Sequence, residues 1–139
     1  MNDPYNLNRF VSAQAPVIEQ VRAELRAGRK RGHSMWFVFP QIAGLGHSDM
    51  ARRYAIASLD EARAFAAHEI LGARLIECAA LVVAVKGRSI GEIFGSPDDL
   101  KFHSSMTLFA RAAPQEQVFK DALQKYFGGA EDRATVERI

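Results

Sequence analysis

Helix-start signals recur along this chain, and they constrain its fold more than any other feature of the sequence. The clearest is Ser96-Pro97-Asp98-Asp99, which combines a capping hydroxyl, a first-turn proline and two acids at the positive end of a helix dipole. Ser58-Leu59-Asp60-Glu61 and Ser89-Ile90-Gly91-Glu92 both have the capping-box pattern, in which a serine and a glutamate each satisfy a free backbone amide. Helices are therefore expected to begin directly after these three serines.

Between these signals, apolar residues recur at helical spacing. They predict helices over 5–15, 16–28, 48–54, from 59 onward, 70–85, 90–95, 97–113 and 115–127, with a last turn or two between 132 and 139. The helix over 70–85 has apolar residues around most of its circumference and is expected to be the central, most buried one. Segment 35–42 is aromatic and β-branched around Pro40, so it is expected to be extended or irregular, and buried. No repeat or long linker divides the chain, which predicts a single, mainly α domain over residues 1–139.

The composition supports one folded domain and narrows the classes of function. The 139 residues are 48% hydrophobic and 24% charged, which is typical of a globular protein. The formal net charge of +2 argues against a general nucleic-acid coat but allows a local basic patch. Cys78 is the single cysteine, which excludes an internal disulfide and favours a reducing, cytoplasmic location. The N-terminus does not have the pattern of a signal peptide, and the longest apolar run, 79–85, is far shorter than the roughly 20 residues of a membrane span.

Spacing argues against several kinds of catalytic or cofactor site. The four histidines lack the short separations of a metal-ligand set, and no second cysteine joins them, so no metal is expected. No Gly-x-Ser-x-Gly or P-loop motif occurs, and Gly44-Leu45-Gly46 lacks the third glycine of a dinucleotide fingerprint. The sequence therefore predicts no cofactor.

One segment joins aromatic side chains to fixed positive charge. Arg29-Lys30-Arg31 precedes 33–41, which contains the only tryptophan, Trp36, together with Phe37 and Phe39. Stacking on an aromatic face and ion pairing beside it can hold a flat, anionic ligand such as a nucleotide. Two structural interpretations compete with this one. Cations are favoured at the C-terminal end of the preceding helix, and aromatic residues most often belong to the core, as we expect of Phe37.

A second candidate lies on the helix that the clearest start signal opens. Lys101, Ser104 and Ser105 are three or four positions apart across one side of it, close to Asp98 and Asp99 in the first turn. A lysine, two hydroxyls and a carboxylate together can bind phosphate and ribose hydroxyl groups. The competing interpretation is a solvated helix face, which is the commoner case for such residues.

Three ordered motifs resemble one bacterial family. They are Gly28-Arg29-Lys30-Arg31 with 35–41, then 51–56, then Leu100-Lys101 with 104–109. Together they are similar to the domain-of-unknown-function family numbered 1810, whose members are often labelled calpastatin-like. The resemblance extends over nearly the whole chain. The calpastatin label implies a disordered inhibitor, which this composition does not match.

The same family resembles the NADAR superfamily, which is named for its association with NAD and ADP-ribose. That resemblance implies a compact, mainly helical fold and the cleavage of N-glycosidic bonds in ribosylated substrates. Phe10-Val11-Ser12-Ala13-Gln14 is similar to an aromatic-x-Gln-Ala-x element of the superfamily. The chain departs from the pattern at Asn8, where many such enzymes have a glutamate, and at 132–136, where a Trp-Gly element is expected.

The leading hypothesis is a cytoplasmic domain that binds a nucleotide or ADP-ribose-like small molecule and, in its enzymatic version, hydrolyses the N-glycosidic bond. Such hydrolysis needs a carboxylate to stabilise an oxocarbenium-like state or to activate water. The assigned residues are Asp98 or Asp99 as that carboxylate, Arg29, Lys30 and Lys101 for phosphate, Ser104 and Ser105 for ribose, Trp36, Phe39 and Tyr54 for stacking, and Gln41 for a base edge.

The alternative is a non-catalytic interaction domain that docks a partner through segment 29–41. The modest net charge and the lack of a nucleic-acid motif favour a protein partner over RNA. No heptad seam is visible, so the oligomeric state stays open.

Overall fold

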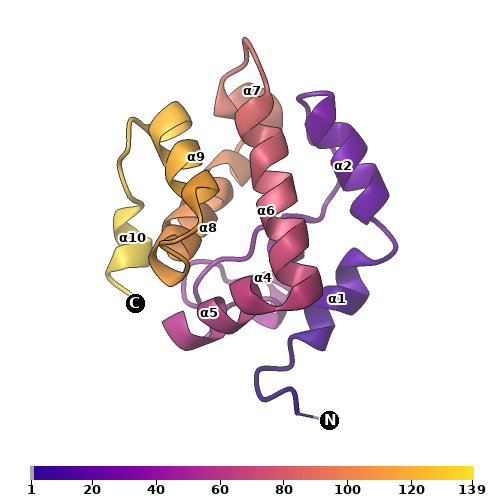
Figure 1. The fold of residues 1–139 in the computed structure, drawn as a ribbon, viewed down its shortest axis with the longest axis vertical. Coiled ribbons are helices and arrows are strands. Elements are labelled where there is room, and N and C mark those ends of the chain that lie inside the picture. The colour runs from indigo at the N-terminus through magenta and orange to yellow at the C-terminus, as the bar shows by residue number, and fades with distance from the viewer. Residues whose placement is uncertain (1) are drawn as a thin grey trace.

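The computed structural model describes residues 2–139, and within that range the chain forms ten helices and no strand (Figure 1). The helices are α1 (Asn8–Gln14), α2 (Ile18–Arg26), α3 (Met35–Val38), α4 (Asp49–Arg53), α5 (Leu59–Ala67), α6 (Glu69–Ala84), α7 (Ile90–Phe94), α8 (Asp98–Ala112), α9 (Gln117–Phe127) and α10 (Arg133–Val136). An isolated parallel β-bridge joins Ile42 to Ile56. The prediction of a mainly α fold is confirmed. None of the described helices combines the length and the apolar character needed to cross a membrane.

Two helices organise the packing. α6 packs against α1, α2, α5 and α9, and α8 packs against α3, α5, α7, α9 and α10. In Figure 1, α6 descends through the middle of the molecule with α2 on one side and α8 and α9 on the other. Eight residues of α8 are buried, compared with six of α6. The prediction that 70–85 is the most buried helix is therefore wrong. The reason is that Ala73, Ala80 and Ala84 lie on the outside of α6, where small apolar side chains tolerate solvent.

Helix starts follow the capping serines with one exception, but the capping box predicted at Ser58 is incomplete because Glu61 accepts the N–H of Ala57 instead of that of Ser58. Ser48, Ser58 and Ser89 each accept the N–H of the residue three positions later at 3.1 Å, as the pattern predicts. α8 begins at Asp98, one residue later than predicted, and no side chain caps it. Pro97 occupies the N-cap position of α8, which leaves Ser96 one residue too far out, so the predicted serine cap is wrong there.

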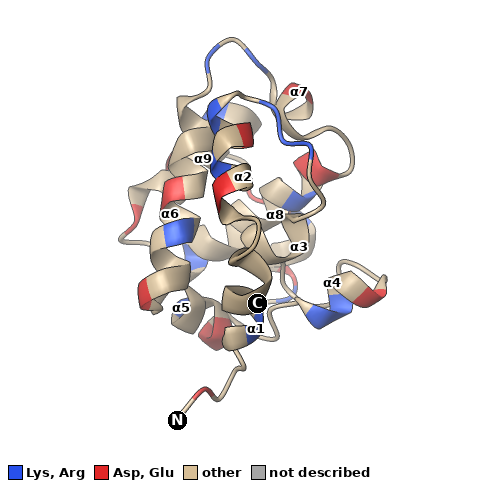
Figure 2. Ribbon diagram, turned by 90° about the vertical axis from the view of Figure 1, so that its right-hand side faces the viewer, with Lys and Arg blue, Asp and Glu red and all other residues tan. Residues whose placement is uncertain are grey.

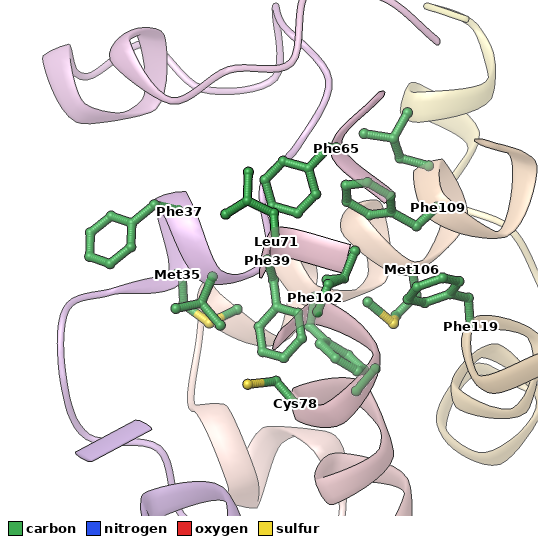
Figure 3. Packing of buried hydrophobic residues seen from close by; sticks show 14 of the residues in the cluster. Met35, Phe37, Phe39, Phe65, Leu71, Cys78, Phe102, Met106, Phe109 and Phe119 are labelled. Carbon is green, nitrogen blue, oxygen red and sulfur yellow. The ribbon is translucent and has the colours of Figure 1, made fainter. Parts of the chain in front are cut away.

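Segment 35–42 is buried as predicted, but it begins with a helical turn. Met35–Val38 forms α3, and Phe39 (φ −126°, ψ 73°) leaves the helix directly before Pro40. A proline disfavours helical backbone only at the residue before it, so a single turn fits upstream of Phe39. Figure 3 shows Phe39 within the buried cluster and Phe37 at its margin. The largest fully buried rings are Phe10, Phe39, Phe65, Phe102, Phe109 and Phe119.

Candidate functional site

Three hollows adjoin at Trp36, which lines all of them. The first lies between residues 41–46 and α4, the second extends to α8 and the start of α10, and the third lies beside His33 and the start of α8. We call the three together the Trp36 groove. Its chemistry comes from Trp36, Gln41, Asp98, Lys101, Ser104 and Asp132.

The short helix α3 sets the direction of Trp36. Its neighbours Met35, Phe37 and Val38 are buried, whereas Trp36 is only partly buried and lines the groove. Gln14 is itself buried, and its side-chain amide donates to the Phe37 carbonyl at 2.7 Å. This bond ties the end of α1 to α3, so the indole is carried by a turn that the core and a buried hydrogen bond both hold in place.

Lys101 places a positive charge over the indole. Its Nζ lies 4.8 Å from the centre of the Trp36 ring, within the range of a cation–π contact, and 3.5 Å from Asp98 Oδ1. The Lys101 and Asp98 side chains are 23% and 28% exposed, so both can reach a molecule in the groove. Asp99 instead accepts the N–H of Leu100 at 2.9 Å and lines none of the three hollows. Of the two carboxylates assigned from the sequence, only Asp98 reaches the groove.

Asp132 brings a second carboxylate to the groove. Its Oδ2 accepts the hydroxyls of Ser104 at 2.8 Å and Thr135 at 2.6 Å, and its N–H donates to Thr107 Oγ1 at 2.8 Å. No hydrogen bond within residues 2–139 reaches its other oxygen, Oδ1. The sequence pattern predicts Asp132 only as a helix cap. It does hold the N-cap position of α10, but its side chain bonds hydroxyl groups rather than the helix backbone.

Gln41 and Tyr54 lie where the groove meets the core. Gln41 is partly exposed and lines the first and second hollows. Tyr54 lines the first hollow but is only 6% exposed, and its ring packs 5.8 Å from that of Phe10 and 5.3 Å from that of Phe37, centre to centre. Gln41 can therefore contact a ligand directly, whereas the ring of Tyr54 is held in the core.

Phe39 and Ser105 do not line the groove, which corrects their assignment as ligand-binding residues. Both are fully buried. Phe39 packs edge-on against Phe102, with ring centres 5.0 Å apart. Ser105 follows Ser104 by one position, about 100° around the helix, so when Ser104 lies at the groove Ser105 turns into the core. Its Oγ has no hydrogen-bond partner in the described residues.

The basic run Arg29-Lys30-Arg31 does not line the Trp36 groove. The Lys30 side chain is fully buried, with Nζ donating to the Gly32 carbonyl at 2.5 Å and lying 3.7 Å from Glu24 Oε1. Burial lowers the pKa of Lys30, against the attraction of Glu24, which raises it. Arg29 is exposed but lines a different hollow, with Arg31. Lys30 is thus a structural residue here, and the hollow lined by Arg29 and Arg31 shares no residue with the Trp36 groove.

The model of the family described as "Protein of unknown function (DUF1810)" matches residues 4–139. This chain belongs to the DUF1810 family. It is also similar to the conserved hypothetical protein Rv1873 from Mycobacterium tuberculosis, known from a crystal structure. The two are 64% identical, the match covers 97% of this chain and 96% of the other, and the TM-score is 0.96. No curated protein matches the chain. The helical fold of this DUF1810 protein is therefore shared with a structure determined by crystallography.

Several groove residues of this DUF1810 protein are not among the site residues assigned from the sequence. They are His33, His47, Ser48, Arg52 and Leu100, in addition to Asp132. They come from loops and helix ends that are far apart along the chain, so spacing does not group them. Leu100 is 62% exposed at the rim. Within residues 2–139 no group of three or more His, Cys, Asp or Glu side chains is arranged to hold a metal ion.

Proposed function

We propose that the Trp36 groove binds a nucleotide or ADP-ribose-like ligand. The observation that carries the proposal is the Lys101 ammonium 4.8 Å from the centre of the Trp36 ring, on the wall of an open groove. The ring offers a stacking surface to a base, and the ammonium offers an ion pair to a phosphate. The present partner of Lys101 is Asp98 at 3.5 Å. Because partly exposed ion pairs of this kind contribute little, a phosphate can compete for the ammonium.

The second hollow suits the sugar of such a ligand. Ser104 and Asp132 lie there with the Asp132 carboxylate oriented by two hydroxyl donors. A carboxylate oxygen is an acceptor only, so Oδ1 is suited to the O–H groups of a ribose. Gln41 has both an amide donor and an acceptor, which suits it to the edge of a base stacked on Trp36.

The resemblance to the NADAR superfamily supports an enzymatic version of this proposal, in which the groove hydrolyses an N-glycosidic bond. Water adds to the sugar carbon, the bond to the base breaks, and the base leaves with a proton, through a state in which positive charge develops on the sugar. Asp98 and Asp132 both line the groove and bring negative charge to it. We assign this role to one of these two carboxylates and not to Asp99.

Fluorescence tests the binding step directly, because Trp36 is the only tryptophan in the chain. We expect AMP and ADP-ribose to change its emission saturably, and ribose 5-phosphate, which lacks a base to stack, to bind more weakly. Lys101→Ala is expected to weaken AMP binding about tenfold, the equivalent of about 1.4 kcal/mol. Lys120→Ala removes the same charge from an exposed position on α9 and is the matched control. No saturable change with any of these ligands, or equal affinities in the two variants, would overturn the proposal.

Chromatography tests the enzymatic version separately. We expect release of the free base from NAD or from a ribosylated base, and its loss in either Asp98→Asn or Asp132→Asn, with Asp99→Asn as the matched control. Saturable fluorescence changes without any released base would support the binding proposal and refute the hydrolysis of an N-glycosidic bond.

A further inference from the structure

A separate hollow, outside the Trp36 groove, is lined by arginines and shares no residue with that groove. It lies between the loop after α2 and the loop before α7, and its walls carry Arg29, Arg31 and Arg88. Figure 2 shows Lys and Arg on both of these loops, at the end of the molecule where α7 lies. All three arginine side chains are exposed. We call this region the basic hollow.

Lys30 holds the first two arginines in place. Its N–H donates to the Ile93 carbonyl at 2.7 Å, and its side chain turns inward to Gly32 and Glu24. Side chains of successive residues in a non-helical, stretched segment point to opposite sides. With Lys30 buried, Arg29 and Arg31 are therefore both directed outward. The buried lysine fixes the orientation of the two exposed cations.

Arg88 comes to the same place from the other loop. Gly28 has φ +76°, and a Cβ built on it would lie 3.2 Å from Arg88 Cδ and 3.4 Å from Arg88 Nε. The arginine side chain therefore packs directly on the backbone of the residue that precedes Arg29. Three guanidinium groups from two loops are thus gathered at one hollow, and one of them is held by packing against a glycine.

No side-chain carboxylate forms an ion pair with any of these three groups in the part of the chain that the structure describes. None of the ion pairs within residues 2–139 includes Arg29, Arg31 or Arg88. Glu92 brings one carboxylate to the hollow. Its Oε1 accepts the N–H of Ser89 at 2.8 Å in the capping box of α7, and this bond, with the nearby charge of Arg88, lowers the pKa of Glu92. Glu24 is directed to Lys30 and to the backbone N–H groups of 31 and 32. The three arginines of the basic hollow therefore outnumber its one carboxylate, that of Glu92, and leave a net positive charge that is available to an anion.

We propose that the basic hollow binds the phosphate groups of a compact oligophosphate, either inorganic or the di- or triphosphate part of a small molecule. Guanidinium groups match phosphate oxygens through paired N–H donors. The arginines meet at a single hollow, which favours a compact anion over an extended polymer. The one aromatic residue in the lining, Phe94, is only 6% exposed, so no ring is free to stack a base, as a site for single-stranded nucleic acid requires.

Calorimetric titration with tripolyphosphate, pyrophosphate and orthophosphate tests this proposal. We expect affinity to rise with the number of phosphate groups, and saturating tripolyphosphate to raise the melting temperature because it relieves repulsion among the arginines. Arg31→Ala is expected to weaken tripolyphosphate binding at least tenfold, because it removes one of the three guanidinium groups from an exposed position. Arg88→Lys keeps the charge but removes the fork of donors and is expected to weaken binding by a smaller factor. Lys86→Ala removes a charge from the loop before α7 outside the hollow and is the matched control.

Three results would overturn the proposal. The first is no saturable binding of tripolyphosphate by the wild-type protein. The second is equal tripolyphosphate affinity in Arg31→Ala and Lys86→Ala. The third is tighter binding of a single-stranded RNA than of tripolyphosphate, with the same loss in Arg31→Ala, which would indicate a nucleic-acid surface. Lys101→Ala is expected to leave tripolyphosphate affinity unchanged, so failure of the Trp36 groove to bind nucleotides would not decide this experiment.

Discussion

Trp36 and Phe39 lie three residues apart, and the structure gives them opposite surroundings. Phe39 is fully buried, with the ring of Phe102 5.0 Å away, whereas Trp36 leaves part of its ring in the groove. Truncating a fully buried large ring costs about 3–5 kcal/mol, because the transfer energy is lost and a cavity remains. We therefore expect Phe39→Ala to lower the free energy of unfolding by about 4 kcal/mol.

Trp36→Ala is expected to cost less, about 2 kcal/mol, because the groove side of the ring is already solvated and no closed cavity forms. That figure includes the contact with Lys101, which at a partly exposed site contributes roughly 0.5–1 kcal/mol. Lys101 keeps Asp98 as a partner after the change, so no buried charge is left alone. Urea unfolding followed by far-UV circular dichroism measures both variants, since Trp36→Ala removes the only tryptophan signal.

The difference in unfolding free energy between Trp36→Ala and Phe39→Ala tests whether the indole lines the groove. A loss in Trp36→Ala as large as that in Phe39→Ala would show that the indole is a core residue and that the groove is closed to ligands. If the indole lines the groove, the folded Trp36→Ala protein is expected to lose roughly 1–3 kcal/mol of nucleotide-binding energy, the value of one base stack. Trp36→Phe keeps an aromatic face and is expected to retain part of that affinity.

Three further predictions concern the scaffold. Ser58→Ala is expected to lower the free energy of unfolding by about 1 kcal/mol because it removes a helix cap, whereas Ser96→Ala is expected to change it by less than about 0.5 kcal/mol in the same urea experiment. Burial raises the pKa of the Cys78 thiol to about 12, so a thiol reagent at neutral pH is expected to react only after unfolding, and rapid reaction of the folded protein would contradict this. For Glu24, burial raises the pKa, but hydrogen bonds from Gln20 and from the 31–32 backbone outweigh it, so the net pKa lies below the ordinary 4.5. The ionised Glu24 carboxylate therefore contributes to the free energy of unfolding above pH 4.5, and this contribution is lost as the pH falls through the lowered pKa. Glu24→Gln is expected to reduce the loss of stability in acid.

Most helix positions could be predicted from the sequence because helix starts depend on local contacts. Ser48, Ser58 and Ser89 each need only a backbone N–H three residues away, and no distant residue has to be known. Ser96 fails as a cap for an equally local reason, since Pro97 takes the N-cap position. The turn before Pro40 is not predicted because aromatic and β-branched composition favours extended structure, whereas Met35–Val38 is helical.

The candidate site could be predicted only in part, because it depends on tertiary contacts. Trp36, Gln41, Lys101 and Ser104 have the right chemistry in the sequence, and the structure brings them to one groove. Whether a ligand binds there is still a prediction. Asp132 is 28 positions from the Ser104 hydroxyl that it accepts, and no spacing rule links the two. Ser104 and Ser105 are both buried, and what separates them is that only Ser104 lines the groove.

The run Arg29-Lys30-Arg31 shows why a cluster of charges in a sequence does not define one site. Lys30 turns inward because Glu24 and the Gly32 carbonyl can satisfy a buried ammonium, and its neighbours are then directed outward to the basic hollow. The Trp36 groove takes its positive charge from Lys101 instead. Since the two regions use different cations, Lys101→Ala and Arg31→Ala are expected to weaken different ligands, nucleotides in the first case and tripolyphosphate in the second. A single substitution that weakened both to the same extent would show that the two hollows act as one site.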